Sequence, residues 1–362
     1  VPYLYQPNWA VRGTTEQYQG SAFYIPLNLF SPDYHWSTTR GYNGQLTLGF
    51  FHDWLVIEGD AYLKRSDDQL LGITLPSQAG FTSVQSNAPY TVQNSGWELT
   101  ISPHPGPLGK NSNRLALSAP SFVFGRNNNK VLNIPPNSPY AAFYRNGQPV
   151  SGVMLVKYAG VDPATGLFQY YKADGKTLTF TPSLVSAYQT INPGDANQLA
   201  NIGTPVFNWG VGEGITWKDL SVNVFLQFVK QKGYNYLYSV YSGGNGPGTP
   251  NYNAPALILG KEWKKPGDQA LLAGFIEGGH SEFISSTAVV SDASYFRLSN
   301  LSVNYRLSGR YIRKAGMKTA AVSINCQNLF TITGYKVGDP STMSIYNIPP
   351  QRVISGGLNL NF

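Results

Sequence analysis

Hydrophobic and polar residues alternate with a period of two along several stretches of the chain. In residues 353–362 the positions Ile354, Leu358, Leu360 and Phe362 fall on one side, and mostly small or polar residues fall on the other. Successive side chains of a β-strand point to opposite faces, so this alternation predicts a strand with one apolar and one polar face. The same pattern predicts strands at 42–50, 55–64, 220–228, 301–308 and 321–327, and less regular patterns predict strands near 92–102, 115–126 and 205–216.

The connections between these expected strands alternate between short and long. Short connections fall at 51–54, 103–113 and 217–219, and long ones at 66–90, 127–204 and 232–293. Outer-membrane β-barrels show this asymmetry, with short turns on the periplasmic side and long loops on the outside. We therefore expect the apolar faces to contact lipid and the polar faces to line a lumen. Glu213 breaks the pattern, since it falls in the apolar row of its strand.

The composition supports a membrane barrel over a helical membrane protein. Only 12% of the residues are charged, about half the usual share of a soluble domain. No window holds the ~18 consecutive apolar residues that a transmembrane helix needs. The net charge of +7 comes from scattered residues and not from one dense run, so a nucleic-acid partner is not expected. A single cysteine, Cys326, excludes an internal disulfide and a cysteine-based metal site, and no metal or other cofactor is predicted.

The expected lumen rows are rich in Asn, Ser, Gly and Gln and have little bulk. A small closed barrel must fill its interior with side chains, so about ten strands of this kind do not make a complete barrel. We predict an all-β fold in which residues 1–362 form the C-terminal part of a larger antiparallel transmembrane β-barrel.

Phrases over most of the chain carry a family resemblance. DASYFRLSNLSVNYRLS (292–308), CQNLFTITGYKVGDP (326–340) and YNIPPQRVISGGLNLNF (346–362) are similar to phrases in the C-terminal half of SusC/RagA-type TonB-dependent transporters of Bacteroidetes. KYAGVDPATGLFQYY (157–171) and EWKKPGDQ (262–269) resemble further phrases in the same order. The resemblance is specific for the family and gives no information on the substrate.

The resemblance implies a barrel of ~22 strands in the outer membrane, an N-terminal plug and a TonB box. The plug, the TonB box and the earlier strands have no counterpart in this sequence. The implied function is uptake of bulky nutrients, oligosaccharides or possibly peptides, without catalysis. The implied partners are a SusD-like surface lipoprotein that acts as a lid, TonB acting through the N-terminal region, the remainder of the barrel, and membrane lipid.

Two sets of residues are candidates for function. Leu358, Leu360 and Phe362 resemble the apolar C-terminal signal that the barrel-assembly machinery reads. The aromatic residues Trp36, Tyr90, Tyr234 and Tyr236 lie in or next to expected outer connections, where flat rings can stack on sugars; this assignment rests on residue type alone.

Two other interpretations remain open at the level of sequence. A passive, porin-like barrel without a plug requires that this chain closes on itself. A soluble β-rich binding protein requires that the chain dissolves without detergent, which the lipid-facing rows oppose. An enzyme is not expected, because no catalytic constellation is found among the four histidines and the acidic residues.

Overall fold

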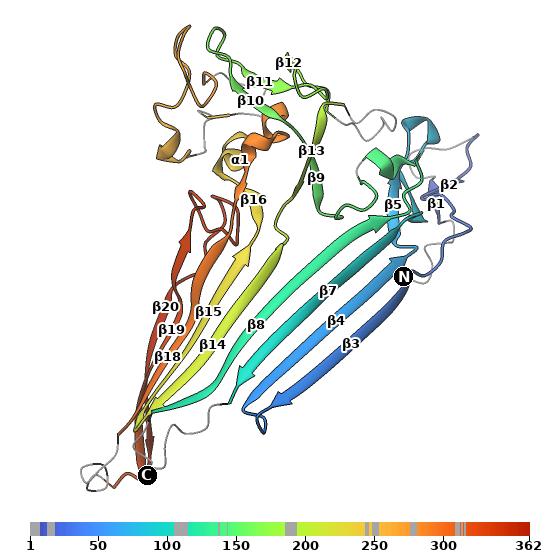
Figure 1. The fold of residues 1–362 in the computed structure, drawn as a ribbon. Helices are drawn as coiled ribbons and strands as arrows, with labels where there is room; N and C mark the ends of the chain where they lie inside the picture. The colour runs from blue at the N-terminus through green and yellow to red at the C-terminus, as the bar shows by residue number, and fades with distance from the viewer. Residues whose placement is uncertain are drawn as a thin grey trace.

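A large antiparallel sheet of nine long strands forms the body of the protein (Figure 1). The structure is a computed structural model, and it describes residues 8–12, 19–104, 115–136, 138–142, 144–184, 194–242, 246–247, 253–275, 281–307, 312, 314 and 316–362. The nine strands are β3 (Thr38–Phe50), β4 (Leu55–Asp67), β7 (Thr91–Pro103), β8 (Leu115–Leu132), β14 (Phe207–Trp217), β15 (Leu220–Lys230), β18 (Tyr295–Leu307), β19 (Thr319–Thr333) and β20 (Val353–Asn361). They confirm all nine segments that the alternation predicts.

The order of the strands across the sheet follows the chain. It runs β20-β19-β18-β15-β14-β8-β7-β4-β3, and each strand is antiparallel to its neighbours. The two outermost strands, β3 and β20, do not pair with each other in the described part of the chain. The sheet is therefore open, and the passive-barrel requirement that this chain closes on itself is not met there.

The register sorts the side chains into an apolar and a polar face. Residues directly opposite one another lie on the same face of a sheet. One continuous outer row crosses eight strands and consists of Leu46, Gly59, Leu99, Phe124, Trp209, Phe228, Phe296 and Ile332. A row of the other face consists of Asn223, Ser302, Asn325 and Ser355. The first row suits hydrocarbon and the second suits water.

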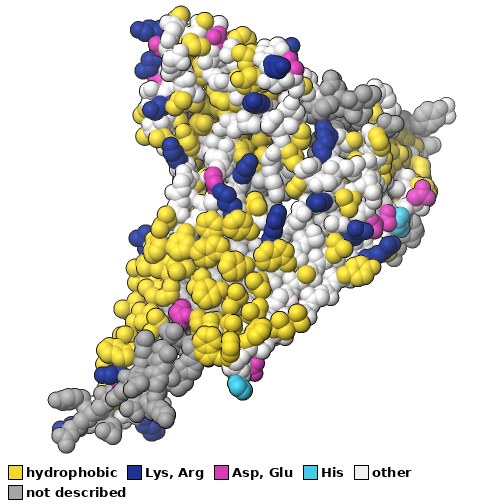
Figure 2. Space-filling view, in the orientation of Figure 1, with side chains coloured by type: hydrophobic (Ala, Val, Ile, Leu, Met, Phe, Trp, Pro, Cys, Tyr) yellow, Lys and Arg dark blue, Asp and Glu magenta, His cyan; other side chains and the backbone are white. Residues whose placement is uncertain are grey.

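Aromatic residues border the apolar face at both ends of the strands. Trp217 and Tyr305 are exposed at the short-turn end, and Phe207 is exposed at the opposite end of β14. The ten residue steps from Phe207 to Trp217 cover roughly 33 Å along the strand, or about 25 Å across the membrane at the usual tilt. Figure 2 shows the resulting hydrophobic band, which has the height and the girdles of an outer-membrane barrel surface.

The long connections fold into small structures that lie together at one end of the sheet (Figure 1). Their strands are β5 (Leu70–Thr74), β6 (Ser83–Asn87), β9 (Gly152–Val156), β10 (Tyr158–Val161), β11 (Phe168–Tyr171), β12 (Leu178–Thr179), β13 (Ala196–Asn201), β16 (Lys232–Tyr234) and β17 (Val290–Asp292). Their helices are α1 (Tyr236–Tyr241) and α2 (Ser281–Ile284), with 3₁₀ turns at Ser77–Ala79, Pro139–Ala142, Ala256–Ile258 and Thr287–Val289. The hairpin of β1 (Trp9–Arg12) and β2 (Phe23–Pro26) precedes β3 at the same end of the sheet. None of the described helices is long and apolar enough to cross a membrane.

Two buried clusters hold these connections in shape. The larger cluster includes Val156, Phe168, Tyr241, Phe283 and Val289 and joins separate connections of the chain. The smaller cluster packs Tyr90 against residues around Val131 and Ile134. The long connections are therefore packed structures with cores of their own, and they can present fixed binding surfaces.

The face assignment predicts the effect of charge at the middle of the sheet. We expect Val224→Arg, on the apolar face of β15, to destabilise the folded protein by about 2–4 kcal/mol. The adjacent Asn223→Arg places the same charge on the polar face and is expected to cost less than about 1 kcal/mol. Urea unfolding of the protein in lipid measures both costs. Equal costs for the two variants would contradict the assignment.

Candidate functional site

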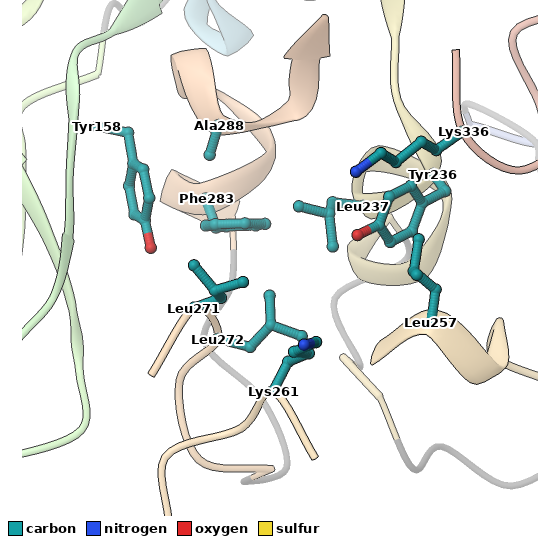
Figure 3. Close-up of a pocket in the computed structure, with 10 residues that line it drawn as sticks. All are labelled: Tyr158, Tyr236, Leu237, Leu257, Lys261, Leu271, Leu272, Phe283, Ala288 and Lys336. Carbon is teal, nitrogen blue, oxygen red and sulfur yellow. The ribbon is translucent and has the colours of Figure 1, made fainter. Parts of the chain in front are cut away.

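A cavity of about 450 Å³ lies within the long connections (Figure 3). Ligand pockets of proteins typically measure about 300–1,000 Å³. The lining is mainly apolar and combines residues from distant parts of the chain: Tyr158, Tyr236, Leu237, Leu257, Lys261, Leu271, Leu272, Phe283, Ala288 and Lys336. Because these residues are distant in sequence, the cavity exists only once the larger cluster has packed.

Aromatic stacking behind the cavity fixes its wall. Phe283 stacks on Phe168 with the ring centroids 4.1 Å apart, and Tyr158 meets Phe283 edge-on at 5.6 Å. Tyr241, which is almost fully buried, closes the cluster against both phenylalanines. Such pairs stabilise by about 0.5–1.5 kcal/mol each beyond their buried area, so the wall is rigid before any ligand arrives.

A tight turn in the KYAGVDPATG segment holds a second wall. Gly166 has a left-handed backbone (φ 72°), and a Cβ there would lie 2.4 Å from the ring of Trp263. The indole Nε1 of Trp263 donates a hydrogen bond of 2.9 Å to the carbonyl oxygen of Pro163. Only glycine fits this turn, and the contact places the segment that carries Lys261 beside the cavity.

Two lysines line the cavity, and an unpaired hydroxyl is buried in its wall. Lys261 and Lys336 each lack an ion pair with any residue that the structure describes. The hydroxyl of Tyr158 is buried and has no hydrogen-bond partner among the described residues, and burial raises the pKa of this tyrosine above its usual value. An unpaired buried hydroxyl is costly. The cavity therefore offers two positive charges around an apolar centre.

The four aromatic residues that the sequence suggests for substrate binding lie in different environments. Tyr236 lines the cavity. Tyr234, on the preceding strand β16, does not line it; its ring stacks on that of Tyr238 in α1, with the ring centroids 3.9 Å apart. Tyr90 is only 5% exposed and packs against Tyr140 and Tyr144, 5.2 and 5.4 Å away. Its ring is therefore part of a core and has no free face of the kind that sugar stacking needs.

Trp36 lies outside this site and remains open to solvent. Its side chain is 70% exposed, in the segment that enters β3. The neighbouring residue His35 is paired with Asp68 at 3.4 Å. Sequence reasoning missed Tyr158, Lys261 and Lys336, although Tyr158 sits in the KYAGVDPATG phrase and Lys261 next to EWKKPGDQ.

An ion pair attaches the last long connection to the sheet beside this site. Arg297, on the inner face of β18 and 4% exposed, donates two hydrogen bonds of 2.8 and 2.7 Å to the carboxylate of Asp339. Its Nε donates to Thr331 Oγ1, and its guanidinium lies 4.7 Å from the ring centroid of Tyr295. Both bonds to Asp339 come from Nη2, and charge-assisted hydrogen bonds are about twice as strong as neutral ones. Together with the bond to Thr331 they hold residues 334–350 against the sheet.

Further hydrogen bonds hold the same connection against the cavity wall. The amide of Gln231 donates to Pro340 O at 3.0 Å, and the hydroxyls of Tyr335 and Tyr346 donate to the carbonyl oxygens of Tyr234 and Ser239. These contacts place Lys336 at the rim, beside the α1 segment. The Arg297–Asp339 pair thus positions one of the two pocket lysines.

The proposed assembly residues lie on the outer face of the edge strand. Leu358, Leu360 and the adjoining Phe362 have exposed side chains on the apolar side of β20. β20 pairs only with β19 in the described part of the chain. The placement fits a lipid-facing edge, and the role as an assembly signal stays a prediction.

Comparison with known proteins identifies relatives over almost the whole chain. No family model matches. The TonB-dependent receptors P3 and P39 of Formosa agariphila are each 22% identical to this chain, over 90% and 95% of it respectively. The chain spans 34% and 38% of the length of these two proteins.

The fold has counterparts among solved structures. The RagAB peptide transporter superposes with a TM-score of 0.73 at 22% identity, covering 99% of this chain and 39% of that one. The "closed-closed" state of the RagAB peptide importer gives the same TM-score at 23% identity. The chain is thus a homologue of TonB-dependent receptors, with the fold of part of an outer-membrane barrel, and these relatives are receptors and transporters rather than enzymes. The predicted fold class is confirmed.

Removing one member of the buried ion pair is expected to release the connection. Arg297→Met leaves the Asp339 carboxylate without its main partner, which costs about 3–5 kcal/mol for a buried pair. We expect limited proteolysis of the full-length receptor to cut within residues 334–350 in this variant. The double variant Arg297→Met with Asp339→Asn removes the unpaired charge and should be cut more slowly. Equal protection of the wild type and the single variant would show that the pair does not hold the connection.

The same pair predicts a dependence on pH. Burial raises the pKa of Asp339, but hydrogen bonds from Ser341 and Arg297 outweigh it, and the net pKa lies below the usual value. A carboxyl group whose pKa is lower in the folded than in the unfolded state stabilises the folded state at pH values above its unfolded pKa, which is about 4 for aspartate. This stabilisation is lost as the pH falls from the unfolded pKa through the lower folded pKa. Protection of residues 334–350 should therefore persist at about pH 5 and decline below about pH 4. Asp339→Asn should abolish this dependence.

Proposed function

We propose that this chain is the C-terminal barrel region of a TonB-dependent outer-membrane importer and that the cavity in its long connections captures the substrate. The observation that carries the proposal is the cavity itself, a rigid apolar site with two lysines on the loop side of a lipid-facing sheet. Substrates of an importer are met first at the outer ends of the barrel loops. The polar inner face of the sheet then borders the route inward.

The chemistry of the cavity favours a peptide over an oligosaccharide. Its centre is aliphatic and aromatic, and its charged groups, Lys261 and Lys336, match a carboxylate. A peptide with an apolar side chain and a free or side-chain carboxylate satisfies both features. A neutral sugar leaves both ammonium groups unpaired. The peptide importer RagAB shares the fold, which supports the same choice.

A passive pore is the less supported function. The nine strands leave both sheet edges unpaired in the described residues, and the relatives are more than twice as long as this chain. We infer that further strands complete the barrel, that a plug coupled to TonB gates it, and that a SusD-like lipoprotein covers the outer connections. The solved RagAB transporter, whose name joins two components, supports a two-component assembly.

Charge reversal at the cavity tests the proposed site. Lys261→Glu with Lys336→Glu is expected to weaken binding of acidic, apolar peptides to the full-length receptor at least tenfold, since two attractive charges become repulsive. Lys265→Glu changes a nearby exposed lysine outside the lining and should leave binding unchanged. Isothermal titration with a peptide library and with neutral oligosaccharides compares the variants. Tight oligosaccharide binding that is lost in Trp36→Ala and unaffected by the lysine changes would support the sugar alternative instead.

Energy dependence separates import from passive flow. Uptake of a bound peptide by whole cells is expected to stop when the proton-motive force is collapsed. Uptake that continues at the same rate would support the passive pore.

A further inference from the structure

Three basic side chains and one glutamine form a row on the lipid-facing side of the sheet, at the end where the long connections emerge. Arg40, Arg65, Gln93 and Lys130 lie directly opposite one another on β3, β4, β7 and β8. Adjacent strands are about 4.8 Å apart, so the row extends roughly 14 Å. A fourth basic residue, Arg126, lies two rows nearer the membrane centre, opposite Trp97. Figure 2 shows Lys and Arg side chains along this border of the hydrophobic band.

No ion pair between described residues neutralises the row, although Asp67 lies one row farther out on the same face of β4. Arg40 and Arg65 are direct cross-strand partners, and like charges so placed repel. None of the ion pairs between described residues involves Arg40, Arg65, Arg126 or Lys130. Arg65 uses its Nε to donate to Gln93, at 2.9 Å, and keeps its terminal nitrogens for other partners. An anion bound across the row would remove the repulsion and satisfy both guanidinium forks.

The height of the row along the strands corresponds to the level of lipid headgroups. One row below it lies Tyr42, 69% exposed on β3, and two rows below lies Trp97 on β7. Exposed Tyr and Trp side chains of a barrel mark the boundary between hydrocarbon and headgroups. The basic row therefore lies just outside the hydrocarbon, on the side where the long connections emerge.

A depression of about 450 Å³ lies in the apolar band as a shallow groove and begins two rows below the basic row, at the level of Ala61 and Trp97. From the apolar face it is lined by Gly44, Leu46, Gly59, Ala61, Trp97 and Leu99. Gln45, Asp60 and Glu98 complete the lining, and alternation along the strands directs their side chains to the opposite, polar face. A Cβ added to Gly44 or Gly59 would meet no atom within 4 Å, so the depression exists because these side chains are missing. It is shallow and open to the membrane side, and its outward-facing side chains are apolar, so an acyl chain can lie along it.

We propose that this surface binds a phosphate-bearing lipid of the outer leaflet, with the phosphate on Arg40, Arg65 and Lys130 and one acyl chain in the groove. Guanidinium groups bind phosphate oxygens in a bidentate manner, and Arg126 is placed to reach a second acidic group nearer the chain. The basic row matches the phosphate of such a lipid, and the groove matches its acyl chain. The proposal rests on the membrane placement of the barrel and is independent of the cavity in the connections.

Lipid retention by the purified full-length receptor tests this site. The receptor is stripped of lipid in detergent, incubated with bisphosphorylated lipid A, and measured by native mass spectrometry. We expect the triple variant Arg40→Gln, Arg65→Gln, Lys130→Gln to retain less than about a tenth of the lipid that the wild type retains, because three phosphate contacts are lost. Lys64→Gln is the matched control, because Lys64 is the neighbour of Arg65 on the opposite face of β4. It should retain the wild-type amount.

A second variant separates the groove from the charges. Gly59→Leu fills the groove without a steric clash and suits a strand, so it is expected to fold and to reduce retention at least threefold. Dephosphorylated lipid A should bind at least tenfold more weakly than the phosphorylated form.

Equal retention by the triple variant and the wild type would overturn the proposal. Full competition by millimolar inorganic phosphate would show a site for the free anion and would also overturn it. Retention of an acidic protein in place of lipid on the wild type alone would assign the row to a protein interface.

Discussion

The need to pair every backbone amide within hydrocarbon is the constraint on which this structure depends. A spanning strand has no water to bond to, so its N–H and C=O groups must all face another strand. In the described residues the nine-stranded ladder meets this need except at the outer edges of β3 and β20 and at local register shifts between β8 and β14, β15 and β18, and β18 and β19. Side-chain alternation follows directly, because each paired strand has one face toward lipid and one toward the lumen.

Glu213 is an exception to the alternation of apolar and polar side chains. It lies on the apolar face of β14 between Val211 and Ile215, and Oε1 of its carboxyl group is buried without a partner among the described residues. Opposite it, β8 contains a bulge around Pro120, where the register with β14 shifts. Proline cannot donate to a ladder and is found at such bulges. Nothing in the structure explains the choice of a carboxylic acid here.

The outer connections obey a different physical requirement from the sheet. They are in water and must bury apolar side chains against one another, which they do around Phe168, Tyr241 and Phe283. The buried Arg297–Asp339 pair then links this loop structure to the barrel wall. Binding surfaces in the connections are thereby held at fixed positions relative to the strands, although the long strands contribute little of their lining.

The sequence by itself determined the strands, their faces and the end of the sheet that carries the long connections. These properties depend on period-two alternation and on loop length, which are local and can be read without contacts. It also indicated the family through phrases such as CQNLFTITGYKVGDP. Residue type alone was a poor guide to the site, because Tyr90 and Tyr236 look alike in sequence, yet one is buried in a core and the other lines a cavity.

Only the tertiary structure decided which distant residues meet. Lys261 and Lys336 come from connections separated by two long strands, and Arg40, Arg65 and Lys130 come together through the register of four strands. Register and loop packing depend on pairings between residues far apart in the chain, and a shift of one residue would reverse every face. Alternation specifies that a strand has two faces, but only the assembled sheet specifies which side chains share them.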